Sequence, residues 1–147
     1  MRVLLDTNIL ARAAAGPPGP AHELFLRLTH HEHVLLISQP LTDELARIMR
    51  YERVRKIHGM PDSEIDEYIA GIVLVAEQVD SQAQTLPVVI ADPDDDAVVA
   101  TAIKGRADAL CTLDRHLFQP SVVEHCGLQG IEVMADIELL ARLRERA

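Results

Sequence analysis

The chain has 147 residues, of which 48% are hydrophobic and 25% charged, a balance that is typical of one globular domain and excludes intrinsic disorder. The net charge of −9 excludes a basic surface over the whole chain, and 3% aromatic residues disfavour an aromatic platform that stacks single-stranded bases. The longest uncharged apolar stretch, Ile69–Ala76, is too short to span a membrane. We therefore expect a single cytoplasmic domain over residues 1–147.

Apolar runs alternate with amphipathic stretches along the chain, and this alternation predicts strands and helices in turn. In chain order we expect a strand at Arg2–Leu5, helices at Asn8–Ala15 and Ala21–Leu28, a strand at Val34–Ser38, a helix at Pro40–Arg50, a long helix from Pro61 through Glu77, a strand or extended connector at Pro87–Ile90, a helix at Asp94–Lys104, strands at Ala109–Leu113 and Ile131–Met134, and a helix at Asp136–Arg146. This order predicts an α/β domain whose parallel sheet is covered on both faces.

Acidic residues gather where the predicted strands end. Asp6 ends the first strand and Asp114 follows the strand that begins at residue 109, so both side chains should open on the carboxyl edge of the sheet. Asp43 and Glu44 are predicted in the first turn of the helix after the second strand, on the same edge. Asp92–Asp96 lie just ahead of another predicted helix. Four segments that are distant in sequence are thus expected to converge.

Several carboxylates within a few ångströms repel one another, and a divalent cation removes that cost. Because the acidic segments carry no cluster of Cys or His, hard oxygen ligands favour Mg²⁺ or Mn²⁺ over zinc. Such ions lower the pKa of a bound water and stabilise charge on a phosphoryl group under attack. The pattern therefore predicts chemistry on a polyanionic substrate in spite of the overall negative charge.

Each acidic segment also fits a purely structural role. Asp92–Asp96 can cap the following helix, and Asp43 and Glu44 can interact with a helix dipole. Asp6 can cap the helix after the first strand, but a carboxylate directly after a buried strand is poorly solvated and needs a partner. The prediction of a metal site depends on the combination of segments.

Four motifs in order resemble those of the PIN-domain family across essentially the whole chain. They are LLDTNIL at residues 4–10, LTDEL at 41–45, DPDDD at 92–96 followed by VATA at 99–102, and ADALCTLD at 107–114. The DPDD-type third motif is similar to that of a branch described as VapC-like toxin components of toxin–antitoxin systems.

The resemblance implies a three-layer α/β/α sandwich with a central, mainly parallel sheet, and a Mg²⁺- or Mn²⁺-dependent endoribonuclease with a cognate antitoxin. Carried over by position, it implies the catalytic acids Asp6, Glu44, Asp95 and Asp114, the metal ligands Asp6, Asp95, Asp96 and Asp114, and the supporting polar residues Asn8 and Thr112. The spacing to residues 100–102 favours Asp95 as the acid of the third motif, and the spacing back from Asp114 favours Asp96. His116 departs from the family, which often has an acid there.

Basic residues follow Glu44 closely, with Arg47, Arg50, Arg53, Arg55 and Lys56 within ten positions. They either contact an RNA backbone beside the acids, as we predict for Arg47, Arg50 and Arg53, or form a solvated helix face. The apolar segment Ile69–Ala76, with Tyr68, belongs either to the core or to the surface of a homodimer.

Three other functions fit parts of the pattern. A receiver-like signalling domain also clusters acids around Mg²⁺, but it needs a Lys near the pocket, and the only lysines here are Lys56 and Lys104. A phosphatase with Asp6 as nucleophile would carry an acid two residues later, where this chain has Asn8. A catalytically silent PIN-type scaffold would bind RNA or protein without cutting.

Overall fold

The computed structural model describes residues 1–30, 32–80 and 93–146, the last range without the side chains of residues 93–96. Five parallel strands form one sheet in the order β3-β2-β1-β4-β5. Their bounds are β1 Arg2–Leu5, β2 Val34–Ile37, β3 Glu77–Gln78, β4 Ala109–Cys111 and β5 Glu132–Met134. The predicted alternation of strands and helices and the parallel sheet are confirmed; residues 87–90 lie outside the described part of the chain.

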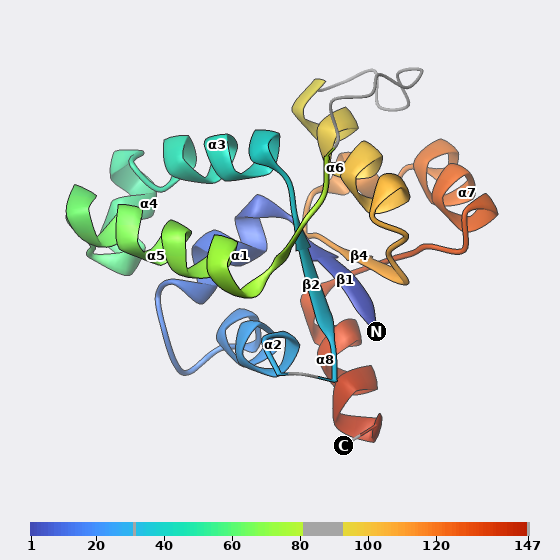
Figure 1. The fold of residues 1–147 in the computed structure, drawn as a ribbon, viewed down its shortest axis with the longest axis horizontal. Coiled ribbons are helices and arrows are strands. Elements are labelled where there is room, and N and C mark those ends of the chain that lie inside the picture. The colour runs from blue at the N-terminus through green and yellow to red at the C-terminus, as the bar shows by residue number, and fades with distance from the viewer. Residues whose placement is uncertain (31, 81–92, 147) are drawn as a thin grey trace.

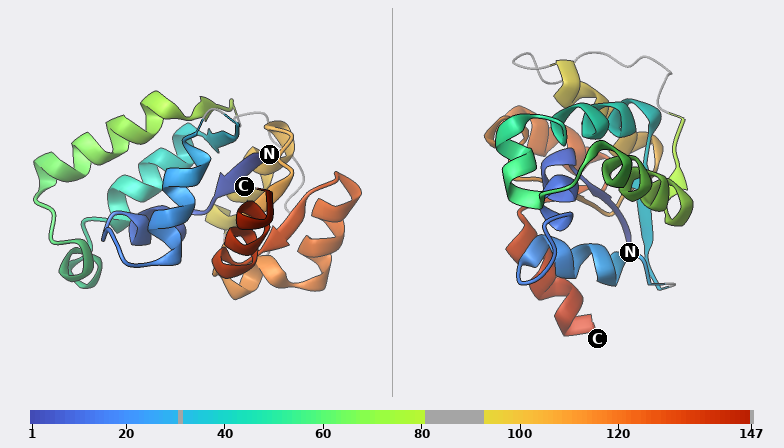
Figure 2. Two further views of the ribbon diagram at one scale, coloured as in Figure 1. Left: turned by 90° about the horizontal axis from the view of Figure 1, so that it is seen from below. Right: turned by 90° about the vertical axis from the view of Figure 1, so that its left-hand side faces the viewer.

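Helices cover both faces of the sheet, so the domain is a three-layer α/β/α sandwich, as expected. Their bounds are α1 Thr7–Ala13, α2 Pro20–Leu28, α3 Gln39–Ile48, α4 Glu52–His58, α5 Asp62–Val75, α6 Pro93–Lys104, α7 Pro120–Leu128 and α8 Asp136–Arg146, with a 3-10 turn η1 at Arg115–Phe118. Helices α1, α3, α4 and α5 lie on one side of the strands and α6 and α7 on the other (Figure 1). Helix α2 packs against α8, and both ends of the chain lie in this region (Figure 2).

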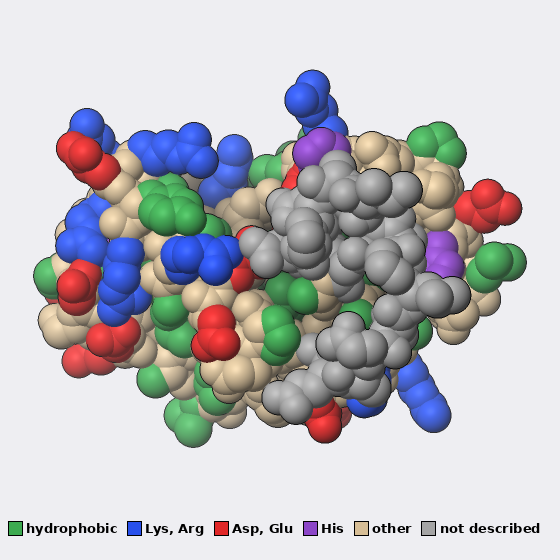
Figure 3. All heavy atoms as spheres, turned by 90° about the horizontal axis from the view of Figure 1, so that it is seen from above, with side chains coloured by type: hydrophobic (Ala, Val, Ile, Leu, Met, Phe, Trp, Pro, Cys, Tyr) green, Lys and Arg blue, Asp and Glu red, His purple; other side chains and the backbone are tan. Residues whose placement is uncertain are grey.

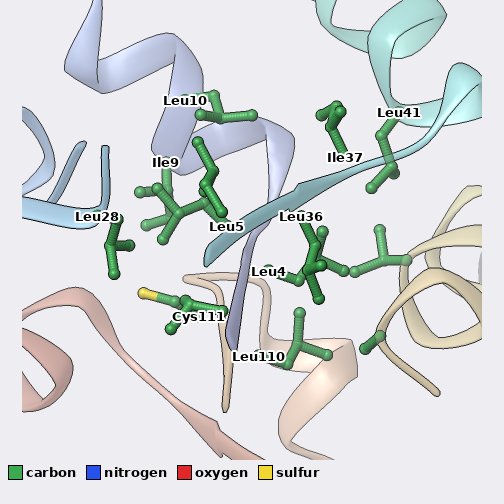
Figure 4. Close-up of a cluster of buried hydrophobic side chains, with 14 of the residues drawn as sticks. Leu4, Leu5, Ile9, Leu10, Leu28, Leu36, Ile37, Leu41, Leu110 and Cys111 are labelled. Carbon is green, nitrogen blue, oxygen red and sulfur yellow. The ribbon is translucent and has the colours of Figure 1, made fainter. Parts of the chain in front are cut away.

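The core consists of apolar strand residues that point alternately to the two helical layers, because successive residues of a strand face opposite ways. Parallel pairing places the side chains in register, Leu4 beside Leu36 and Leu110, and Leu5 beside Cys111. Figure 4 shows these side chains with the residues of α1 and α3 that meet them. All of the strand residues in this cluster are essentially inaccessible to solvent: Leu4, Leu5, Leu36, Ile37, Leu110 and Cys111.

Two helices and one strand were not predicted, each for a physical reason. Helix α4 has seven residues and buries none of them fully, and its two apolar residues, Val54 and Ile57, make too short a pattern to detect. Helix α7 was missed although Pro120 begins it, since its sequence has only weak amphipathic periodicity. Strand β3 has two polar, exposed residues at the sheet edge, and the first of them, Glu77, was predicted as the end of the helix before it. Instead α5 ends at Val75, and Glu77 pairs with β2.

The apolar segment Ile69–Ala76 divides between core and surface. Ile69 and Ile72 are buried, whereas Val73, Leu74 and Val75 are exposed, Leu74 by 86%. One face of this segment packs against α3 and belongs to the core, and the other faces outward. The expectation of a core segment is therefore correct for one face, and the outward face is the part open to a dimer contact. None of the described helices is long and apolar enough to cross a membrane.

A buried pair of hydroxyls links α3 to α6, the two helices that carry the second and third acidic motifs. Ser38 Oγ and Thr101 Oγ1 lie 2.8 Å apart, both residues are inaccessible to solvent, and Thr101 Oγ1 also donates to the carbonyl of Ala97 at 2.7 Å. Replacing Thr101 leaves the Ser38 hydroxyl buried and unpaired, which typically costs about 1–3 kcal/mol, whereas replacing Ser38 removes the hydrogen bond between the two hydroxyls and leaves Thr101 bonded to Ala97.

We expect Thr101→Val and Ser38→Ala each to destabilise the protein, and the double variant to lose less free energy of unfolding than the sum of the two. Urea denaturation of the four proteins measures this coupling as a double-mutant cycle. Strictly additive losses would show that the two hydroxyls do not interact.

Candidate active site

Asp6 connects the first strand to the first helix and is almost completely buried. It is 4% exposed and caps α1, with Oδ1 accepting from the Thr7 backbone N–H at 2.7 Å. Its Oδ2 accepts a 2.6 Å hydrogen bond from the Thr112 hydroxyl. Burial raises the pKa of Asp6 above its usual range, the nearby charge of Asp114 adds to this rise, and the hydrogen bonds from Thr112 and Thr7 oppose it. Asp6 is therefore both a helix cap and a carboxylate that is poorly compensated at neutral pH.

Thr112 joins Asp6 to Asp114 from the end of β4. The hydroxyl that donates to Asp6 also accepts the backbone N–H of Asp114 at 3.0 Å. Asp114 caps η1, and its Oδ1 accepts the backbone N–H of His116 at 2.9 Å. The His116 ring lies with Nδ1 3.4 Å from the same oxygen. The Thr112 hydroxyl thus links the carboxylate of Asp6 to the backbone of Asp114.

The two aspartates flank the point at which the strand order reverses. From β1 the chain proceeds outward through β2 to β3, and it then returns to place β4 on the other side of β1. In open α/β sheets, ligands bind outside the carboxyl ends of the strands at such a point. Since Asp6 follows β1 and Asp114 follows β4, the fold places this pair where a ligand is expected.

A pocket of about 460 Å³ brings Glu44 of α3 and Asn8 of α1 to the same cavity as Asp6 and Asp114. Glu44 was predicted in the first helical turn, and this was wrong: α3 begins at Gln39 and has no acid in its first turn. The neighbouring Asp43 is exposed and accepts a 2.8 Å hydrogen bond from the Gln39 side chain, away from this cavity. Three of the predicted catalytic acids therefore share one pocket.

The third acidic motif was expected ahead of a helix, and the part that the structure describes lies inside it. Helix α6 begins at Pro93, so the backbone of Asp95 and Asp96 belongs to its first turn. Asp92 and the side chains of Asp95 and Asp96 lie outside the described residues. The choice between Asp95 and Asp96 remains a prediction.

Seven further residues of the pocket were missed by sequence reasoning, and helical spacing would have found three of them. Arg12 stands one turn after Asn8 on α1, and Ile48 stands one turn after Glu44 on α3, so each pair shares a helix face. Ala11 lies one turn after Asn8 on α1 as well, and the remaining missed residues that line the cavity are Thr7 after Asp6, Tyr51 after α3, and Val54 and Ile57 on α4.

The basic cluster after Glu44 separates into paired and pocket-lining residues. Arg50 forms ion pairs with Asp62 and Asp66 of α5, and Arg55 pairs with Asp62. Arg53 lines the pocket, and Arg47 is exposed on α3. Figure 3 shows Lys and Arg side chains gathered over the end of the molecule formed by α3 and α4, with acidic side chains between them.

The donors that converge on the pocket suit a hard divalent cation. Among the residues that the structure describes, no group of three or more His, Cys, Asp or Glu is arranged to hold a metal ion. The described donors are nevertheless all oxygens: the buried carboxylate of Asp6, the adjacent Asp114, and Asn8 Oδ1, which is buried and has no hydrogen-bond partner among the described residues. An orphaned acceptor beside a carboxylate of raised pKa is an environment that Mg²⁺ or Mn²⁺ would relieve.

Comparisons with known proteins agree with this architecture. The family described as "PIN domain" matches residues 2–116, which contain all four acidic motifs. No curated protein matches the chain in sequence. Among solved structures, a chain of the crystal structure of VapBC2 from Rickettsia felis bound to a DNA fragment from their promoter is similar in fold, with a TM-score of 0.60 and 17% identity over 90% of this chain and 98% of that one. With the family matched over most of its length, this chain belongs to the PIN-domain family.

Proposed function

We propose that this protein is a Mg²⁺- or Mn²⁺-dependent endoribonuclease that hydrolyses RNA phosphodiester bonds. The observation that supports this most is the shared pocket of Asp6, Glu44 and Asp114 at the carboxyl edge of the sheet, in a chain of the PIN-domain family. When bound, a divalent ion supplies Lewis-acid chemistry toward a phosphate oxygen. Asp6 and Asp114 would hold it, together with Asp95 or Asp96.

In this proposal each polar residue of the pocket has a separate role in hydrolysis. The Thr112 hydroxyl fixes the rotamer of Asp6 through its 2.6 Å hydrogen bond and orders the turn that carries Asp114. Glu44, which lines the same pocket, accepts a hydrogen bond from the attacking water and orients it toward phosphorus, in line with the leaving ribose oxygen. Asn8 completes the polar wall, and Arg53 contacts the RNA backbone. RNA contacts by Arg47 and Arg50 remain predictions from the sequence.

The strand order argues against the receiver-like alternative. Receiver-type sheets have the order 2-1-3-4-5, whereas this sheet has the order 3-2-1-4-5. The silent scaffold is distinguished by assay. We expect the purified protein to cleave a mixed RNA pool with Mn²⁺ and not with EDTA, and Glu44→Gln to lower the rate while Asp43→Asn does not. Metal-independent binding of uncut RNA would contradict the nuclease and favour the scaffold.

We further propose that the protein is the toxin of a type II toxin–antitoxin pair and acts in the cytoplasm. This rests on the family and on the fold shared with a chain of VapBC2, which was crystallised on DNA from its own promoter. A cognate antitoxin is the expected protein partner, and a homodimer could use the exposed residues Val73–Val75. Expression of the wild-type protein should arrest growth, and co-expression of the small protein encoded next to it should restore growth.

A further inference from the structure

The active-site pocket extends well beyond its carboxylates. Its volume of about 460 Å³ falls in the range of about 300–1,000 Å³ that holds whole small-molecule ligands. On α3, Ile48 lies one turn from Glu44, and Tyr51 follows the end of the helix, so the wall changes from acidic to apolar along the helix axis. Ile57 of α4 adds to the apolar part. The carboxylates account for only one part of this cavity.

Two cations line the cavity without ion-pair partners among the described residues. Arg12 on α1 and Arg53 on α4 are both exposed and take part in no salt bridge there. Arg55, two residues from Arg53 on the same helix, is paired with Asp62. Because an unpaired guanidinium on a pocket wall attracts anions, the ligand of this part carries negative charge.

Tyr51 supplies an exposed aromatic surface at the same place. Of the four aromatic residues in the chain, Phe25 and Tyr68 pack on each other with ring centroids 6.0 Å apart, and the Tyr68 hydroxyl donates to Leu10. Tyr51 is 43% exposed and lines the pocket, beside Ile57 at 64%. The composition disfavours a platform of several rings, but one ring and a guanidinium in the same pocket suffice to hold one base.

We propose that this part of the pocket binds the nucleotide next to the scissile phosphate of a single-stranded RNA. Its base lies against Tyr51 and Ile57, and its phosphates meet Arg12 and Arg53. The inference rests on the proposed function, because it takes RNA as the ligand that reaches the carboxylates. A peptide segment would match both parts only if it carried acidic side chains next to its apolar ones, whereas every nucleotide joins a base to a phosphate and so matches the apolar wall and the arginines together.

The test separates stacking from charge by comparing two polymers. Binding is measured in the Asp6→Asn background with EDTA, so neither cleavage nor a metal ion enters the readout. The probes are a fluorescein-labelled single-stranded RNA and the same ribose-phosphate backbone without bases. We expect Tyr51→Ala to weaken RNA binding about tenfold, since stacking on one ring commonly changes affinity by this order, and to leave the base-free polymer unaffected. Tyr51→Phe should keep the affinity.

Arg53→Ala should weaken the binding of both polymers. It should also reduce the slope of log affinity against log salt concentration by about 0.7, as expected for one lost phosphate contact. The matched control Arg55→Ala removes the same charge from the same helix and should leave the slope unchanged. The chain has no Trp and two tyrosines, one of them packed against Phe25, so quenching of tyrosine fluorescence on RNA binding reports Tyr51 directly.

If Tyr51→Ala changed the affinity for the two polymers equally, or changed neither, the inference would be overturned. The apolar wall would then be assigned to a protein partner. Cleavage by the wild-type protein with Mn²⁺ is assayed separately. Binding that depends on Tyr51 without any cleavage would support the base site and contradict the nuclease. Cleavage with binding independent of Tyr51 would contradict the base site alone.

Discussion

Asp6→Asn is expected to lower RNA cleavage by about a thousandfold and to stabilise the metal-free protein at the same time. The rate falls because removing one preorganised charged ligand from a phosphoryl-transfer site typically costs this much. Stability rises because the carboxylate is 4% exposed and its pKa is raised by burial and by Asp114, so its charge opposes folding at neutral pH. The amide keeps the size of the side chain and an acceptor oxygen for the Thr7 N–H.

Asp43→Asn is the matched control for this variant. It also removes one carboxylate, from the residue next to Glu44 in the sequence, but Asp43 is exposed and hydrogen-bonded to Gln39. Its cleavage rate and melting temperature should stay close to those of the wild-type protein. If Asp6→Asn cleaved RNA at the wild-type rate, Asp6 would be a helix cap and no more.

The gain in stability of Asp6→Asn over wild type depends on pH, and its direction follows from the raised pKa of Asp6. A carboxyl whose folded pKa lies above its ordinary 3.8 favours folding at low pH, and this contribution is lost as pH rises through the folded pKa. The free-energy difference between Asp6→Asn and wild type should therefore grow from pH 3.8 upward and level off above the folded pKa. Groups with lowered pKa oppose this trend but are shared by both proteins and cancel: Glu23, Asp62, Glu77 and Glu132.

Mn²⁺ is expected to raise the melting temperature of the wild-type protein by about 5–10 °C at a hundredfold excess over its dissociation constant. Mass action at this excess contributes about 2.7 kcal/mol, and for a domain of this size 1 kcal/mol corresponds to about 2–4 °C. The ion relieves the repulsion between Asp6 and Asp114 and the desolvation of Asp6. Differential scanning calorimetry with Mn²⁺ and with EDTA measures the shift.

Most of this shift should disappear in Asp6→Asn and persist in Asp43→Asn. The gain should also shrink at acid pH, where protonated carboxyls cannot ligate a metal. A shift of equal size in wild type and in Asp6→Asn would place the ion elsewhere on the molecule and contradict the assignment.

The convergence of Asp6 and Asp114 could be predicted because it depends only on strand ends. Any parallel pairing of the first strand with the strand at Ala109 opens both residues on one edge, whatever the details of packing. A supporting role for Thr112 was expected from its position in the motif and stays a prediction, and the hydrogen bonds that link it to both aspartates emerge only from the folded backbone.

The wall formed by Arg12 and Tyr51 could not be found from strand ends. Tyr51 lies at the start of helix α4, which buries none of its residues fully and is too short to give a clear apolar pattern in the sequence. The ion pairs of the basic cluster could not be predicted either, since only the position of α5 brings Asp62 and Asp66 to Arg50 and Arg55. Long-range ion pairs of this kind have no local sequence signal.

The most direct test of the central claim is the anomalous scattering of Mn²⁺ in crystals of the wild-type protein soaked with the ion. The account predicts a peak between the carboxylates of Asp6 and Asp114, with oxygen ligands at about 2.0–2.2 Å, and no peak there in Asp6→Asn. Manganese bound only at other positions, with the two carboxylates left unligated at neutral pH, would contradict it.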